Sequence, residues 1–180
     1  MRHVNDSQPF VDHLRREHRR LHEAVQATEA ALAQWAGTKH GELDVVQQLT
    51  ALRSELDRHY TEEEEGGCLE EAESRCPSLA GEVKRIEGEH ALLRNEMDRL
   101  VEQASDVVET SGEVDRLQRA FQQFAARLRS HEAAENRIMA YGFGAEAMDE
   151  LIEDLNHVDA GPCACGDRQA DAARNDNFKE

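Results

Sequence analysis

The chain has 180 residues, of which 39% are hydrophobic, 33% are charged and only 4% are aromatic. This length suits one ordinary domain, and the scarcity of aromatic residues and β-branched runs argues against a β-sandwich or barrel and for a helical protein. The 38 acidic residues outnumber the 21 Lys and Arg, so the net charge is −17. A protein that binds nucleic acid or an anionic membrane needs a basic surface, and we therefore expect neither partner.

Apolar residues recur every three or four positions in four long segments, which is the spacing that keeps one face of a helix in a core. The stripe residues are Val11, Leu14, His18, Leu21, Val25, Thr28, Leu32 and Trp35 in the first segment, Val45, Leu49, Leu52, Leu56, His59 and Glu63 in the second, Leu79, Val83, Ile86, His90, Leu93, Met97, Leu100 and Ala104 in the third, and Val114, Leu117, Phe121, Phe124, Leu128, His131, Glu135 and Ile138 in the fourth.

Proline, glycine and capping residues predict the helix boundaries. Pro77 follows the second segment, and proline is tolerated as a first helical residue. Thr110 and Glu113 have the spacing of a capping box before the fourth stripe. Gly142 and Gly144 are natural stops for the fourth helix.

Short connections favour antiparallel neighbours, so the sequence predicts an all-α, up-down-up-down four-helix bundle. We expect this domain to occupy residues 1–158, with a short C-terminal helix over 145–155 and a flexible, disordered tail over 159–180. No apolar stretch approaches the roughly 20 residues that span a bilayer, and the N-terminus has no hydrophobic signal segment. We therefore expect a cytoplasmic protein.

Six ionisable residues occupy stripe positions that otherwise carry Leu, Val, Ile or Phe. Burying such groups is costly unless they are paired or bind a metal. Each helix supplies one histidine, and the second and fourth helices add a glutamate four residues later, one turn along the same face. The six are His18, His59, Glu63, His90, His131 and Glu135.

A rise of about 1.5 Å per residue brings these six groups to one level in one half of the bundle. For His59 and Glu63 to match that level, we expect the second helix to continue through Gly66 and Gly67 to about Glu71. Four imidazoles and two carboxylates suit a first-row transition metal and are too many for one ion. If both carboxylates and one oxo or hydroxo group bridge two non-haem iron ions, each ion keeps about one open position for O₂, NO or peroxide.

The stretches that carry these residues resemble the hemerythrin-like, or HHE cation-binding, domain family. They are REHRRLHEAV around His18, RHYTEEEEG around His59 and Glu63, GEHALLRNEM around His90, and SHEAAENRIM around His131 and Glu135. The resemblance covers residues 8–140. It implies a non-haem di-iron site in a four-helix bundle, with Glu63 and Glu135 as bridging carboxylates and the four histidines as terminal ligands.

The pattern differs from that of oxygen-carrying hemerythrins, which have HxxxH on the third helix and HxxxxD on the fourth. Here Arg94 stands four residues after His90, and the fourth helix has HxxxE. The pattern is more similar to the intracellular HHE proteins, including the repair-of-iron-centres group implicated in nitrosative and oxidative stress.

Three functions follow from these observations. The first is a di-iron protein that binds, senses or buffers O₂, NO or peroxide without obligatory turnover. The second is a di-iron enzyme with peroxidase-like or NO-reductase-like chemistry, or with a role in iron-cluster repair. The third is a metal-free helical interaction module whose polar residues are hydrogen-bonded.

Several neighbours of the six residues have alternative interpretations. Glu62, Glu64 and Glu89 are surface charges or hydrogen-bond acceptors for the ligand imidazoles. His22 is a rim residue or a further ligand, and Tyr60 is a packing residue or a redox-active group.

Overall fold

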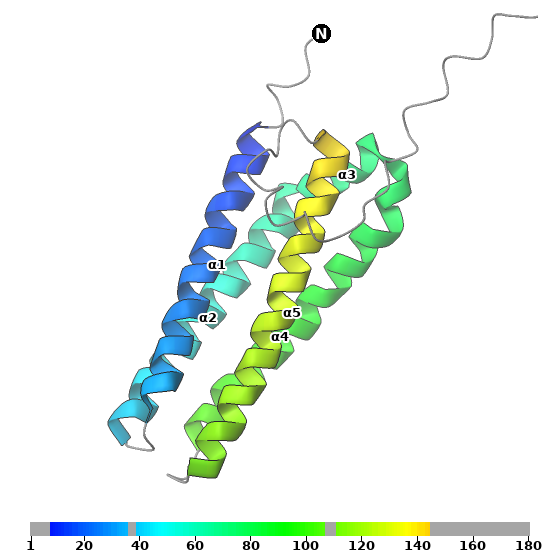
Figure 1. Cartoon of the computed structure of the whole chain (residues 1–180). Helices are drawn as coiled ribbons and strands as arrows, with labels where there is room; N and C mark the ends of the chain where they lie inside the picture. Colours follow the sequence, from blue (N-terminus) through cyan, green and yellow to red (C-terminus); the bar gives the residue numbers. More distant parts are fainter. Residues whose placement is uncertain (1–7, 36–38, 107–110, 145–180) are drawn as a thin grey trace, which may run out of the picture.

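The structure, a computed structural model, describes residues 8–35, 39–106 and 111–144. Within these ranges the chain is helical and has no strand, so the predicted all-α class is confirmed there. Four helices are long and pack against one another, and consecutive long helices run in opposite directions (Figure 1). The elements are α1 (Gln8–Gln34), α2 (Lys39–Gly66), α3 (Cys68–Arg75), the 3-10 helix η1 (Pro77–Leu79), α4 (Ala80–Asp106) and α5 (Ser111–Phe143).

The boundaries predicted at Pro77 and Gly144 agree with the structure, whereas Gly142 lies within α5 and Thr110 of the predicted capping box lies outside the described residues. Pro77 is the first residue of η1, directly before α4, and α5 ends at Phe143, before a left-handed Gly144 with φ 89°. No described helix is long and apolar enough to cross a membrane. The predicted helix over 145–155 and the tail over 159–180 lie outside the described residues.

The second helix does not continue to Glu71, so that expectation is wrong. Gly67 adopts the left-handed conformation, with φ 65° and ψ 21°, and separates α2 from α3. Glycine reaches this conformation without the steric cost that a side chain would incur. The break allows α3 to turn and pack against α5, where Leu69 and Ala72 are buried.

Two apolar clusters lie on either side of a layer of polar residues. The larger cluster contains Leu21, Leu56, Leu93 and Leu128, and the smaller cluster joins Leu14, Ile86 and Ile138 to the buried side chains of α3. Helices α1, α4 and α5 pass from one cluster to the other, and α2 ends between them. The layer where they cross, which we call the polar layer, consists of His18, His59, Glu63, His90, His131 and Glu135. The fold therefore holds ionisable groups between two dry regions.

The smaller cluster depends on close contact between α3 and α5. A Cβ at Gly142 would lie 2.5 Å from the Cβ and 2.6 Å from the Cα of Ala72, a contact that requires the helices to separate. We expect Gly142→Ala to lower the free energy of unfolding by about 1–3 kcal/mol through overpacking.

Chemical denaturation of the two glycine variants measures this effect. Gly88 is exposed within α4 and has open space around its Cα, so Gly88→Ala is the matched control and should raise the free energy of unfolding by up to about 1 kcal/mol. Equal stabilisation by both substitutions would contradict the close packing of α3 on α5.

Candidate metal centre

Four helices bring the six predicted residues together. α1 supplies His18, α2 supplies His59 and Glu63, α4 supplies His90, and α5 supplies the last two. The side chain of His18 is 12% exposed, and the other five residues of the polar layer are at most 6% exposed. Helical spacing explains the arrangement, because side chains four residues apart lie on one face of a helix.

Glu135 connects two pairs of histidines through its two carboxylate oxygens. Its Oε2 lies 3.0 Å from Nε2 of His18 and 3.9 Å from Nε2 of His59. Its Oε1 lies 2.6 Å from Nε2 of His131 and 3.9 Å from Nε2 of His90. Each oxygen therefore faces a different pair of imidazoles, as a bridging carboxylate must.

Glu63 lies between the same two pairs. Its Oε2 is 3.7 Å from Nε2 of His59 and 3.4 Å from Nε2 of His90. One set of ligand atoms within 4.8 Å of one another comes from His18, His59, Glu63 and Glu135, and a second comes from His90, His131 and the same two glutamates. The described residues thus offer two adjacent ion positions that share both carboxylates.

The chemistry of these atoms fits metal ions. Two ligands about 2.1 Å from one ion and at right angles to each other lie about 3 Å apart, close to the separations found here. Buried polar atoms without a hydrogen-bond partner cost about 1–3 kcal/mol each, and the polar layer concentrates them. They include Nδ1 and Nε2 of His59, both carboxylate oxygens of Glu63 and Nε2 of His90.

Carboxylates behind the layer fix the orientation of two imidazoles. Nδ1 of His90 lies 3.1 Å from Oε1 of Glu64, and Nδ1 of His131 lies 3.1 Å from Oε2 of Glu89. An ionised carboxylate only accepts, so each Nδ1–H donates, and each Nε2 faces the centre, where its lone pair would bind a metal ion. Arg94 donates to Glu64 over 2.9 Å, so it acts on this acceptor and not on a ligand carboxylate.

The family model of the hemerythrin HHE cation-binding domain matches residues 9–139. The chain belongs to this family. The matched region contains the whole polar layer, and cation binding is the property for which the family is named. No curated protein and no solved structure matches the chain significantly.

His22 and Tyr60, two residues with alternative interpretations in the sequence, differ in their distance from the polar layer. His22 is exposed, and its Nε2 lies 2.8 Å from Nε2 of Gln26, away from the polar layer. Tyr60 is fully buried and stacks on the ring of His90, with centroids 4.1 Å apart and planes 9° apart. Its buried hydroxyl has no hydrogen-bond partner among the described residues.

The two carboxylates of the centre have opposite pKa shifts. Burial raises the pKa of Glu63 well above its usual value, and the charge of Glu135 adds to the shift. Burial also opposes ionisation of Glu135, but hydrogen bonds from His131 and His18 outweigh it and hold the pKa of Glu135 well below its usual value. Burial lowers the pKa of His59 to about 3. Without metal, the surroundings therefore favour the charged form of Glu135 and the protonated form of Glu63.

A hollow of about 330 Å³ leads from the surface between α1 and α2 to the polar layer. We call it the α1–α2 hollow, and it is lined by His13, Leu14, Arg16, Glu17, His59, Glu62, Glu63, Gly66 and Cys68. His13, Glu17 and Cys68 are not among the polar residues on the apolar stripes, so the sequence did not predict their position at the site. A signal was present, because His13 and Glu17 are four residues apart and so share a helix face directly beside His18.

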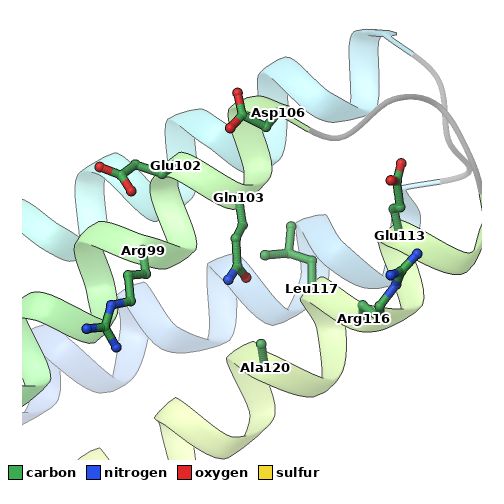
Figure 2. A pocket seen from close by; sticks show the side chains of 8 residues that line it. All are labelled: Arg99, Glu102, Gln103, Asp106, Glu113, Arg116, Leu117 and Ala120. Carbon is green, nitrogen blue, oxygen red and sulfur yellow. The ribbon is translucent and has the colours of Figure 1, made fainter.

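Two further hollows contain no residue of the polar layer. One of about 550 Å³ lies between α4 and α5, where Gln103, Leu117 and Ala120 face one another (Figure 2). The other, of about 410 Å³, is lined by Glu89 and by a charged pair, Arg127 and Glu96. Neither reaches a candidate ligand.

Substitution of His59 tests whether the polar layer lacks hydrogen-bond partners when no metal is bound. Without metal, its two ring nitrogens are buried and have no hydrogen-bond partner. We expect His59→Leu to raise the free energy of unfolding of the chelator-treated protein by about 1–3 kcal/mol, because an apolar side chain carries no such cost.

Denaturant unfolding in the presence of chelator measures the effect. The matched control is His22→Leu on the exposed face of α1, which should change the free energy of unfolding by less than about 0.5 kcal/mol. Destabilisation by His59→Leu would show that the buried imidazole is satisfied without metal, as a metal-free module requires.

Proposed function

We propose that the polar layer binds two iron ions and that the protein binds, senses or buffers O₂, NO or peroxide there. The observation that carries the proposal is the sharing of two carboxylates by two histidine pairs. His18 and His59 face one side of Glu135, and His90 and His131 face the other. A structural site for a single ion does not need this duplication.

The ligand set favours iron. Imidazole nitrogen and carboxylate oxygen together suit iron, whereas sites for Mg²⁺ or Ca²⁺ are built from oxygen, and soft metals prefer sulfur. Bound iron would supply reversible one-electron chemistry and open coordination positions for a diatomic molecule or peroxide. Two histidines and two shared carboxylates leave such positions on an ion that prefers six donors.

The protein's own residues prepare the site. Glu64 and Glu89 hold the Nδ1 protons of His90 and His131, so the Nε2 atoms of both imidazoles face inward. The apolar clusters exclude water on two sides of the layer, and the α1–α2 hollow leaves an opening between α1 and α2. The proton that burial holds on Glu63 must leave when this carboxylate becomes a ligand.

Tyr60 supports a second candidate function, an enzyme with peroxidase-like or NO-reductase-like turnover. Its ring lies against His90, and 5.2 and 5.4 Å from the rings of His59 and His131. Burial raises its pKa above the usual value, and the charges of Glu135 and Glu63 add to the shift, so the phenol stays protonated. A buried phenol without a hydrogen-bond partner beside a redox centre has a proton and an electron to donate.

Titration of the iron-loaded full chain with NO or hydrogen peroxide under anaerobic conditions tests the proposal. For binding, the absorption spectrum should change and reach its end point at about one equivalent per centre. For turnover, many equivalents should disappear, and Tyr60→Phe should slow their consumption by about tenfold or more. Tyr141 lies on α5 six residues after Glu135, is not part of the polar layer and is only partly buried, so Tyr141→Phe is the control.

Different results would contradict the binding function and the enzymatic function. If wild type and Tyr60→Phe consume many equivalents of NO or peroxide at the same rate, the phenol of Tyr60 has no role in turnover. An iron-loaded protein whose spectrum responds to neither NO, O₂ nor peroxide would contradict both functions.

A further inference from the structure

We propose that His13, Glu17 and Glu62 form a transient binding site for a divalent cation at the mouth of the α1–α2 hollow, through which Fe(II) reaches the buried centre. This inference rests on the proposed di-iron function. It assigns a role to residues that are not ligands of the centre. We call these three residues the outer site.

The first argument is access. The residues of the polar layer are almost completely buried, so an ion cannot reach them from solvent without a passage. The α1–α2 hollow is lined both by the outer site and by His59 and Glu63 of the centre. The hollows on the α4 and α5 side, including the one in Figure 2, contain no ligand of the centre.

The second argument is the chemistry of the outer site. One imidazole and two carboxylates each offer a ligand atom, and these three atoms lie within 4.8 Å of one another. Nε2 of His13 is 3.1 Å from Oε2 of Glu62, and the side chain of His13 is 48% exposed. A nitrogen and two oxygens are the same donor types as those of the centre, so one metal ion suits both sites.

The third argument is continuity. Glu17 directly precedes His18, and Glu62 directly precedes Glu63. His59 and Glu63 face the hollow with ring nitrogens and carboxylate oxygens that have no hydrogen-bond partner. An ion that leaves the outer site therefore meets unsatisfied ligand atoms at the inner end of the same hollow.

The fourth argument is charge, which makes the outer site weak. Arg58 lies 2.7 Å from Oε2 of Glu17 and 3.4 Å from Oε1 of Glu62, and Arg20 lies 2.9 Å from Oε1 of Glu17. Arg16 also lines the hollow. These guanidinium groups compete with a bound cation and reduce its affinity. Weak binding suits a site that must release its ion to the centre. The centre itself has no guanidinium group among its candidate ligands.

The test is the rate at which the metal-free full chain takes up Co(II), whose visible absorption reports binding. In the double variant His13→Ala/Glu62→Gln, we expect the initial rate at limiting Co(II) to fall by about tenfold or more, with the final two-ion occupancy of the centre unchanged. The control is His22→Ala/Glu65→Gln, which changes the same residue types at exposed positions outside the hollow and should keep the wild-type rate.

Two more readouts keep the test decisive if the double variant folds poorly. Arg16→Gln removes a positive charge from the hollow and should accelerate uptake, and added salt should slow uptake by wild type. At equilibrium, wild type should bind an additional, weaker Co(II) ion that the double variant does not bind.

The outcomes separate the two proposals. Equal rates in the double variant and its control would overturn the outer site while the centre still fills. Fewer than two tightly bound ions in the double variant would also overturn it, because the residues would then belong to the centre itself. Absence of any Co(II) uptake by wild type would overturn the proposed function and this inference together.

Discussion

The burial of six ionisable side chains between two apolar clusters is the constraint on which the rest of this structure depends. An apolar core at this level would pack without hydrogen-bond partners, whereas imidazoles and carboxylates lose their water and regain little from one another. Glu135 is satisfied through His18 and His131, but His59 and Glu63 are not. This imbalance is the basis for proposing that a ligand completes the layer, and the shared carboxylates are the basis for proposing two cations.

The surroundings of the layer are arranged around the same requirement. Glu64 and Glu89 are more exposed than the imidazoles that they orient, so they place charge at the edge of the site without entering the dry interior. Arg94 stands at the helix position one turn after His90 and holds Glu64 while its guanidinium lies 5.2 Å from the centre of the Tyr60 ring. Metal binding and folding should therefore be coupled, because the free energy of binding offsets the cost of the buried groups.

The sequence predicted the parts of the structure that repeat with helical geometry. The spacing of His59 from Glu63 and of His131 from Glu135 specifies a shared face, and the rise per residue correctly brings all six groups to one level. The expectation of a helix through Gly67 gave too little weight to the local signal of the Gly66-Gly67 pair, because glycine readily adopts the left-handed conformation that separates α2 from α3. The contact between Ala72 and Gly142 on another helix, by contrast, has no local signal. Likewise, nothing local separates Glu64, which accepts from His90, from Glu62, which faces the hollow.

Elemental analysis of the full chain after anaerobic Fe(II) loading and removal of excess metal tests the central claim most directly. The account predicts about two iron ions per chain, and loss of both when Glu63 and Glu135 are replaced together by Leu in a protein that remains helical. Near-zero iron in the wild type would contradict it. The polar layer would then be a buried network without a metal, and the family membership would describe a fold that has lost its cation.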